Sequence, residues 1–177
     1  MIPPLVQYDD TYIIQLQLLK DNKELYETSI SKENNKKDSG FDLFIPETVT
    51  IESGQIKLIN MGVKCAVSKI STKLVINELI LQKMTQSESS PYYLYARSSV
   101  SKRGIILANS VGIIDSGYRG PLMAAFYNTK KESVTIEKGD RIVQICMPNL
   151  SYNFSVNLVE SLDSTERGER GLGSTGK

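Results

Sequence analysis

Apolar residues recur along the chain in many short runs, and turn-forming residues interrupt them at close spacing. The run at 12–19 partly alternates between apolar and polar positions, as a half-buried strand does. Residues 21–30 are predicted to form one or two helical turns, and 31–40 are polar and turn-forming. Further strands are expected at 41–45, 48–52, 55–60, 62–67, 92–96, 104–108, 121–127, 133–137, 141–147 and 154–159. This spacing predicts an all-β sandwich or barrel rather than alternating βα units.

Two stretches depart from this pattern. Residues 68–91 combine a long apolar run with a polar tail, which predicts an extended hairpin, a strand pair or a short helix with a loop, inserted between core strands. The last eleven residues, 167–177, contain four glycines and no apolar periodicity. Such a tail is expected to be mobile unless something holds it. We therefore expect one β domain over 1–166 and a mobile C-terminal arm over 167–177.

The chain has 177 residues, 40% of them apolar, which suffices for one domain with a substantial core. Its 21 Lys and Arg nearly balance its 20 Asp and Glu, so no stable nucleic-acid binding is expected. The chain has no histidine. That absence excludes Ser-His-Asp and Cys-His nucleophile systems, HExxH metalloproteases and zinc centres with histidine ligands. A general base must therefore be Asp, Glu, Lys, Tyr, Cys or a terminal amine.

No apolar run reaches the length of a membrane span, so no membrane association is expected. The N-terminal apolar stretch contains acidic and amide residues and follows no basic region, unlike a secretory signal. Cys65 and Cys146 lie in apolar, strand-like segments without metal-ligand spacing, which favours buried, reduced thiols over a functional pair. We expect an intracellular protein, cytoplasmic or nuclear, and a virus-encoded origin fits the same features.

The segment VGIIDSGYRG (111–120) is the first candidate for chemistry. Apolar residues lead to Asp115, and Ser116 and Gly117 then form a turn in which glycine can adopt a positive φ angle. Desolvation beside buried aliphatic side chains could make this aspartate a competent base. The plainer interpretation is that Asp115 only caps a turn, the common use of Asp-Ser-Gly.

The segment ARSSV combines groups that bind phosphate. Arg97 supplies a planar cation, and Ser98 and Ser99 supply hydroxyls and backbone amides. A surface salt bridge beside a turn is the alternative interpretation, because Arg-Ser-Ser is common in loops.

The C-terminal segment RGERGLGSTGK is richer in such groups. Its glycines let backbone N–H groups surround an anion, beside two arginines and two hydroxyls. Gly168 and Gly173 have the spacing of a P-loop, but Ser174 and Thr175 rather than Lys-Ser/Thr come next and no helix is expected after them, so a Walker A loop is excluded. A disordered tail and a lid that orders on an anionic ligand remain as the alternatives.

The segments SGFDLF and KGDRIVQI are expected to be mainly structural. Asp42 and Asp140 are expected to pair with Arg97 or Arg141 in the core. Gln144 is polar within an apolar run, so it either faces solvent on an alternating strand or is buried with a partner.

Taken together, these segments resemble the five motifs of the homotrimeric dUTP pyrophosphatase (dUTPase) family, in the order SGFDLF, ARSS, LANSVGIIDSGYRG, KGDRIVQI and RGERGLGSTG. The resemblance runs from about Asp38 to the C-terminus. It implies a β-barrel or jelly-roll-like subunit in a homotrimer, with active sites shared among subunits and the arm closing over a neighbour's site. It also implies Mg²⁺-dependent hydrolysis of dUTP to dUMP and pyrophosphate, which limits uracil incorporation into DNA and supplies dUMP for dTMP synthesis.

The resemblance gives Asp115 the catalytic role, because it matches the aspartate that orients and activates the water attacking the α-phosphate. Tyr118 matches the tyrosine whose ring packs under deoxyribose and leaves no room for a 2′-hydroxyl. The residues that would read the uracil edge belong to the hairpin and its return strand: Asn109, Gly112, Ile113, Ile114 and Met123.

The same resemblance implies a set of residues for the phosphates. Asp42 matches the motif-one aspartate, which is expected to hold other site residues in place without contacting the substrate. The residues that match the phosphate-binding positions are Arg97, Ser98, Ser99 and Gln144. The arm that covers the substrate would contribute Arg167, Leu172, Gly173, Ser174 and Thr175.

The composition agrees with this chemistry. Mg²⁺ prefers oxygen ligands and retains several waters, so the triphosphate and water can hold it without protein side chains. Substitution at phosphorus depends on positioning and charge neutralisation, so a single aspartate suffices as the base. A site hydrogen-bonded to the uracil edge would leave buried polar groups unsatisfied against the amine of cytosine, which predicts discrimination between the two.

Three positions depart from the family pattern. Ala96 stands where motif two usually has proline, which loosens the local backbone. Leu172 replaces the phenylalanine that usually stacks on uracil, at a cost of roughly 1 kcal/mol. Arg170 replaces a usual glycine, which adds a charge near the phosphates and restricts the arm. The 68–91 segment is longer than in short members and could serve a separate binding partner.

Two alternatives stay open at this point. A dCTP deaminase, or a bifunctional deaminase–pyrophosphatase, resembles the chain in ARSS and IDSGYRG, but it requires a catalytic glutamate on the strand after the third motif. Here that strand reads PLMAAFYN, with Ala124 and Ala125 and no carboxylate. A non-catalytic regulatory relative would be expected to lose Asp115 or the arm, and this chain keeps both.

Overall fold

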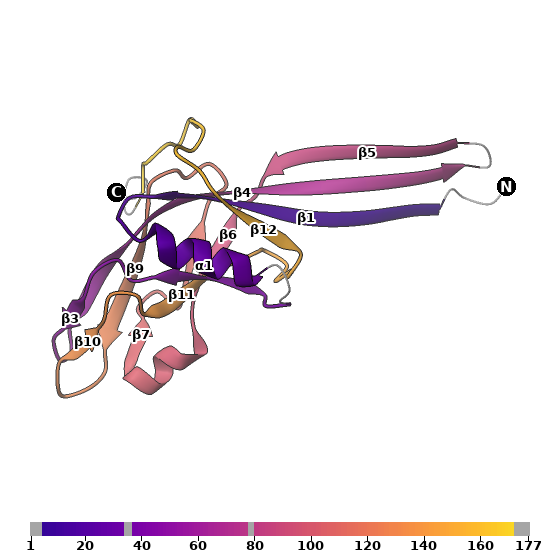
Figure 1. The fold of residues 1–177 in the computed structure, drawn as a ribbon. Helices are drawn as coiled ribbons and strands as arrows, with labels where there is room; N and C mark the ends of the chain where they lie inside the picture. Colours follow the sequence, from indigo (N-terminus) through magenta and orange to yellow (C-terminus); the bar gives the residue numbers. More distant parts are fainter. Residues whose placement is uncertain (1–4, 34–36, 78–79, 172–177) are drawn as a thin grey trace.

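The computed structural model describes residues 5–33, 37–77 and 80–171, and these residues form two main β-sheets and a two-stranded ladder (Figure 1). The six-stranded sheet contains β1 (Leu5–Leu18), β4 (Ile56–Asn77), β5 (Ile80–Ser89), β7 (Ile105–Leu107), β9 (Pro121–Asn128) and β12 (Phe154–Leu158). The four-stranded sheet contains β2 (Gly40–Phe44), β6 (Tyr92–Ala96), β8 (Val111–Ile114) and β11 (Arg141–Cys146). The ladder pairs β3 (Val49–Ile51) with β10 (Val134–Ile136).

Both main sheets are open within the described part of the chain. The larger has the order β12-β1-β4-β9-β7, with β5 added to β4, and the smaller has the order β2-β11-β6-β8. The six-stranded sheet therefore has three edge strands, β12, β7 and β5, and the four-stranded sheet has two, β2 and β8; neither sheet returns to its own first strand. The prediction of an all-β, jelly-roll-like subunit is confirmed. The alternative prediction, a closed barrel, is not formed by the described residues.

The two sheets share one apolar core, because alternate residues of their strands point inward. In β9 the buried positions are Leu122, Ala124 and Phe126, and the residues between them are only partly buried. The four-stranded sheet contributes Leu94 and Ile145, which are equally buried. The partly buried side of β9 is thereby left free for a surface site.

One helix, α1 (Lys23–Glu33), packs its single buried aromatic residue into this core. The Tyr26 ring meets Phe44 edge to face at 5.0 Å, and its hydroxyl accepts a hydrogen bond from the Phe44 backbone N–H at 3.2 Å. Burial raises the pKa of Tyr26. No helix in the described part of the chain has the length and apolarity needed to cross a membrane.

The inserted segment forms a long three-stranded extension. The outer half of β4 pairs with β1 on one side and with β5 on the other, from Ser68↔Ser89 out to Asn77↔Ile80. Figure 1 shows these strands projecting side by side away from the body. The hairpin prediction for 68–91 is therefore confirmed, and the helix-with-loop alternative is wrong.

Several boundaries differ from the predicted ones for identifiable reasons. The strands expected at 55–60 and 62–67 form one strand, β4, because Gly62 adopts a positive φ of 70° in a bulge and its N–H bonds to Asn60 Oδ1 at 2.8 Å. The first strand begins at Leu5 rather than at position 12, since its outer half pairs with the extension. Both cysteines are buried free thiols, as predicted.

Candidate functional site

The third motif runs from β8 through a turn into the start of β9. We call this segment, residues 111–123, the hairpin, although β8 pairs with β6 and β9 pairs with β4 and β7, so its two legs form no ladder with each other. β8 pairs antiparallel with β6 in the register Tyr92↔Ile114 to Tyr95↔Val111, and the chain then turns at residues 115–118 before it enters β9. The Tyr118 backbone N–H closes this turn with a hydrogen bond to the Asp115 carbonyl at 3.0 Å. Asp115 therefore lies at the rim of the hairpin, at the point where the strand ends.

A cavity of about 230 Å³ opens beside this hairpin. Its walls come from β8, the turn, the start of β9 and the C-terminal segment: Asn109, Gly112, Ile113, Ile114, Asp115, Tyr118, Pro121, Met123, Arg167 and Gly171. We call it the hairpin cavity. The structure thus brings together the residues on the hairpin that the resemblance gave to the uracil edge, the deoxyribose and the attacking water, together with Arg167 and Gly171 of the arm.

Asp115 forms an ion pair across the hairpin cavity. Its Oδ2 lies 2.7 Å from Nη1 of Arg167, and the two side chains are 53% and 39% exposed. The expectation that Asp115 lies enclosed by buried aliphatic residues is not met within one chain, because 53% of its side-chain surface is exposed. The carboxylate is accessible to a bound molecule, and a cation is within reach of the same position.

Tyr118 stands on the far wall of the hairpin cavity. Its hydroxyl donates to the Pro121 carbonyl at 3.0 Å, which fixes the ring, and burial raises its pKa. A Cβ on Gly120 would lie 2.4 Å from that hydroxyl, so only glycine allows the ring to occupy this position. Motif three thus requires its final glycine for packing against the tyrosine.

Arg119, which lies between Tyr118 and Gly120, is buried. The sequence around it did not indicate a role. Its backbone N–H donates to the Gly168 carbonyl at 2.8 Å, and its Nη1 donates to the carbonyls of Ser116 and Tyr118 at 2.8 and 2.9 Å. Its Nε donates to Oδ1 of Asp163 at 2.9 Å. A buried arginine requires such partners because an unpaired charge inside a protein is costly.

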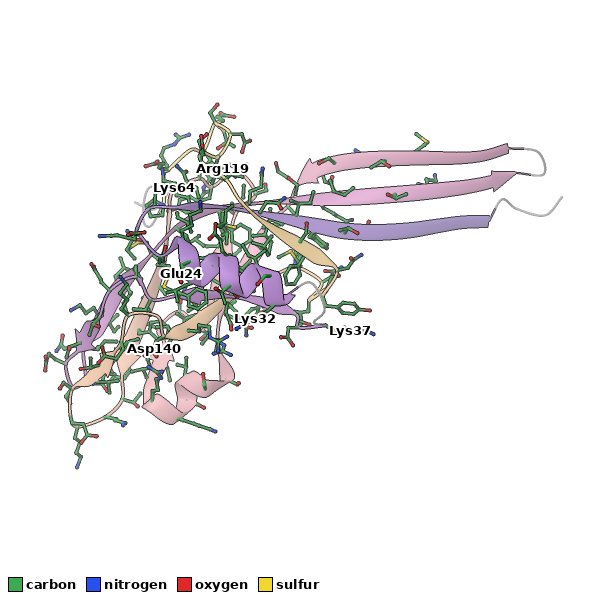
Figure 2. The ribbon with its side chains drawn as sticks, viewed as in Figure 1. Glu24, Lys32, Lys37, Lys64, Arg119 and Asp140 are labelled. Atoms are coloured by element: carbon green, nitrogen blue, oxygen red, sulfur yellow. The ribbon has the colours of Figure 1, made fainter. Side chains whose placement is uncertain are left out.

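The segment before the arm is attached to the same hairpin. The Thr165 hydroxyl donates to the Gly117 carbonyl and accepts the Gly168 N–H at 2.9 Å. Glu169 forms an ion pair with Lys64 of β4. Figure 2 shows Lys64 and Arg119 near each other at the C-terminal loop. The arm is therefore anchored as far as residue 169, while Leu172, Gly173, Ser174 and Thr175 lie outside the described residues.

A second cavity, of about 630 Å³, lies against the four-stranded sheet. Its walls come from β2, β6, β11 and the segments beside them: Lys37, Asp38, Ser39, Gly40, Asp42, Tyr95, Ala96, Arg97, Ser98, Gln144, Cys146 and Leu150. We call it the sheet cavity. Motifs one, two and four therefore meet here, as their pairing in one sheet requires.

Asp42 holds two arginines at the sheet cavity. Its Oδ1 lies 2.8 Å from Nε of Arg97 and its Oδ2 lies 3.1 Å from Nη1 of Arg141, while its side chain is only 14% exposed. The predicted pairing of Asp42 is confirmed. Asp140 pairs instead with Arg103, and this hydrogen-bonded ion pair lowers the pKa of Asp140.

Of the other residues expected to bind phosphates, Gln144 and Ser98 line the sheet cavity and Ser99 does not. Gln144 is half-buried on β11, and a Cβ on Gly40 would lie 2.3 Å from its Oε1, so the glycine of motif one makes room for the glutamine of motif four. Ser98 begins the 3₁₀ helix Ser98–Arg103 and lines the sheet cavity. Ser99 is exposed and lies outside the cavity wall.

The two cavities are separate within one chain and share no lining residue. Arg97 follows one end of β6, whereas Asp115 follows the β8 residue paired with Tyr92 at the other end. Five residues of strand separate these ends, which corresponds to roughly 16 Å. In Figure 2, Arg119 of the hairpin lies near the C-terminal loop, and Lys37 at the sheet cavity lies far from it, beyond α1.

Within residues 5–33, 37–77 and 80–171, no three carboxylate or cysteine side chains come together as a metal site would require. Carboxylates border both cavities, Asp115 in one and Asp38 and Asp42 in the other, and Asp115 and Asp42 already face arginines. The donors present thus fit a divalent cation that is held mainly by ligands from outside the protein.

A family model described as dUTPase matches residues 75–176, more than half of the chain. The deoxyuridine 5′-triphosphate nucleotidohydrolase of Glaesserella parasuis serovar 5 is 35% identical over 143 residues, which cover 78% of this chain and 82% of that relative. The chain belongs to the dUTPase family. Its relative of the same name from Haemophilus influenzae strain PittEE is 37% identical over the same length, with the same coverage.

A solved dUTPase structure extends this likeness to the fold. The dUTPase of Staphylococcus bacteriophage 80alpha, solved with dUPNHPP, is 25% identical, superposes with a TM-score of 0.50, and matches 93% of this chain and 98% of its own. The resemblance found in the sequence is confirmed. As a dUTPase-family member, the chain is a hydrolase of nucleotide metabolism.

The beginning of the arm is held by its own chain, because residues 165–169 contact the hairpin and β4. The expected closure of the arm over a neighbour's site stays a prediction. The arm therefore leaves the body beside its own hairpin cavity.

Proposed function

We propose that this chain hydrolyses dUTP to dUMP and pyrophosphate, with Mg²⁺, and that Asp115 activates the attacking water. The observation that carries the proposal is the hairpin cavity, in which an accessible carboxylate, a tyrosine ring and an exposed stretch of strand backbone face one small space. Curated relatives at 35–37% identity are named deoxyuridine 5′-triphosphate nucleotidohydrolases, which supplies the substrate.

The base would be read by the backbone of β8 and by Asn109. Backbone N–H and C=O groups at the hairpin form a fixed pattern of donors and acceptors, and a pyrimidine edge with the wrong pattern leaves them unsatisfied. Such sites reject a mismatched analogue strongly. Ile113, which is 68% exposed, offers apolar surface for the ring. This arrangement favours uracil over cytosine.

The sugar would lie against Tyr118. Its ring is fixed at one end by the bond to the Pro121 carbonyl and at its side by Gly120. Because the ring has no freedom to withdraw, an additional hydroxyl on the sugar would collide with it. The proposal therefore includes discrimination against UTP.

The triphosphate would be bound by the sheet cavity of another copy of the chain. Arg97 and Ser98 lie roughly 16 Å of strand from Asp115 in the same chain, too far for both to act on one phosphate. A closed trimer with shared sites would join the hairpin cavity of one copy to the sheet cavity of the next.

An apolar surface supports this assembly. Ile56 of β4, Tyr127 of β9 and Ile106 of β7 are paired in one row, and Leu58 follows on the same face of β4. Ile56, Leu58 and Ile106 are 62%, 49% and 51% exposed. Large apolar side chains gathered on one sheet face are typical of surfaces that pack against another subunit.

Mg²⁺ would be held by the triphosphate and water rather than by protein side chains. When bound, it neutralises charge on the phosphate oxygens. The chain's own groups would then orient the reaction: Asp115 accepts the proton of the water, and Arg167 offers a cation beside it. Residues 167–177 would close over the substrate as a lid, attached to a β domain formed by 1–166.

The decisive assay is hydrolysis of dUTP, dCTP, dTTP and UTP, with and without Mg²⁺, scored for pyrophosphate and for ammonia. We expect pyrophosphate from dUTP with Mg²⁺ and little from the other three. Ammonia from dCTP would establish the deaminase alternative, and no turnover of any of them would favour the regulatory one.

The shared site has its own test. Arg97→Ala and Asp115→Asn each disable a different cavity, so both should be inactive alone. Mixed trimers from equal amounts of the two should regain about one quarter of wild-type activity if each site joins two copies. Asp115→Asn mixed with Asn109→Ala, two changes in the same cavity, should regain none. If mixing Arg97→Ala with Asp115→Asn restores no activity, the two cavities do not combine across copies to form one active site.

A further inference from the structure

We propose that Arg119 and Asp163 are positioning residues, which hold the Asp115 turn and the root of the arm in one fixed relation. This proposal rests on the proposed dUTP hydrolysis for its kinetic consequence and on the contacts below for its structural one. We call the four residues Arg119, Asp163, Thr165 and Gly168 the turn clamp.

The turn clamp takes up the carbonyl groups of the turn almost completely. Nη1 of Arg119 binds the carbonyls of Ser116 and Tyr118, and the Thr165 hydroxyl binds that of Gly117. The Asp115 carbonyl accepts the closing bond of the turn itself. Three of the four carbonyls at residues 115–118 are therefore bound by side chains of the clamp.

Asp163 determines the orientation of the arginine. Its carboxylate receives Nε at 2.9 Å and Nη2 at 3.4 Å, which is the forked geometry that suits a guanidinium. With that edge engaged, Nη1 points toward the turn. Arg119 is only 6% exposed, whereas the side chain of Asp163 is 63% exposed. A carboxylate this exposed can be changed with little effect on the core.

The turn clamp also anchors the first residues of the arm. The Arg119 N–H binds the Gly168 carbonyl, and the Thr165 hydroxyl accepts the Gly168 N–H. Arg167, between these anchors, reaches Asp115. Displacement of the turn would therefore displace both the base and the cation that faces it. Misplacement by about 1 Å at a reacting group can reduce a rate by about 100-fold.

The test compares Asp163→Asn with Glu160→Gln, which removes the same charge three residues earlier and outside the clamp. Asp163→Asn should lower kcat for dUTP about tenfold while KM changes less than about twofold, because Asn109 and the β8 backbone are untouched. Glu160→Gln should leave both unchanged. Asp163→Glu, which restores the carboxylate at an exposed position, should recover kcat to within about twofold of the parent.

Amide hydrogen exchange of the unliganded protein supplies a readout that needs no activity. Asp163→Asn should speed exchange in peptides that cover 115–119 and 164–170, and leave a peptide over β11 unchanged. If the parent fails to hydrolyse dUTP, the proposed function fails, and the exchange result still decides whether the clamp exists.

Three results would overturn the proposal. Exchange in Asp163→Asn that matches the parent at 115–119 would show that Asp163 does not hold the turn. A lower melting temperature with unchanged kcat would show a purely structural ion pair. Arg119→Lys, which keeps the charge and loses the fork, should lower kcat at least as much as Asp163→Asn, and normal kcat in that variant would also contradict the assignment.

Discussion

The two cavities each contain an aspartate that faces arginine, and the two pairs differ in burial. Asp42 is 14% exposed and lies between Arg97 and Arg141, whereas Asp115 is 53% exposed and faces Arg167, its one ion-pair partner among the described residues. Both oxygens of Asp42 are engaged, so it can only orient its arginines. Asp115 keeps an open side toward solvent, and its cation comes from the first residue of the arm.

The difference shows how one residue type serves two purposes. A buried carboxylate between two cations neutralises charge and fixes geometry, and it has no freedom left for proton transfer. An exposed carboxylate at the end of a strand is held by its backbone, and its oxygens remain available to water or substrate. We therefore expect substitutions of the two aspartates to affect different kinetic constants.

Asp115→Asn should have the largest effect. Removing the base should lower kcat by about 1,000-fold or more, since positioned general bases contribute about 10²–10⁴. The amide keeps the shape of the side chain, so binding of an imido analogue of dUTP, measured by calorimetry, should stay within a few fold of wild type. Asp21→Asn, an exposed carboxylate ahead of α1, is the control, and retained turnover in Asp115→Asn would assign the base elsewhere.

Deletion of residues 167–177 should rank second, with kcat/KM lower by about 100-fold in a protein that still assembles as a trimer by sedimentation, because lid closure aligns the reacting groups. The shorter deletion of 172–177 keeps Arg167 beside Asp115. Equal losses in the two deletions would assign the effect to the glycine-rich end, and a smaller loss in the shorter one would assign part of it to Arg167. Full activity in both would refute the lid.

Asp42→Asn should have an intermediate effect, mainly on KM. Without the carboxylate, Arg97 and Arg141 repel each other and Arg97 loses its fixed direction, so phosphate binding should weaken about tenfold while kcat falls less. Glu47→Gln, an exposed carboxylate after β2, serves as the control. A fall in kcat as large as that of Asp115→Asn would remove the distinction between the two aspartates.

Asp140→Asn should have the smallest effect and shows what an Asp–Arg pair contributes to folding alone. The Arg103 bond holds the pKa of Asp140 below its usual value, so the stabilisation is present above the unfolded-state pKa of about 3.9 and is lost as the pH falls below it. Thermal melts should show a loss of at most about 1 kcal/mol at pH 7, which shrinks as the pH falls below about 3.9. A loss that persists at low pH would have another cause, and kcat should not change.

The sequence predicted most of the strands, because alternation between apolar and polar positions is a local signal, as in β9. The site residues, such as Asp42, Arg97 and Gln144, were named only through the resemblance of the ordered motifs to a family. The continuity of β4 across Gly62 was missed, since a glycine between two apolar runs usually indicates a turn. The bulge that absorbs it depends on a side-chain bond from Asn60.

The turn clamp could not be predicted from the sequence. Arginine is rarely buried, so Arg119 reads as a surface residue beside the glycines of the turn. Its partner Asp163 lies 44 residues later, in a polar stretch without periodicity. Contacts of this kind form only when the fold brings the end of the chain back to the hairpin.

The reaction rates of the two buried thiols would report how often the protein opens. Burial raises the pKa of Cys65 to about 12 and that of Cys146 to about 11, so at neutral pH almost no thiolate is present and alkylating reagents react slowly with the closed form. Cys65 lies in the core, and Cys146 borders the sheet cavity. The rate at which iodoacetamide labels Cys65 therefore measures how often the core exposes itself. The rate at which iodoacetamide labels Cys146 measures local opening of the sheet cavity, where we expect phosphates to bind.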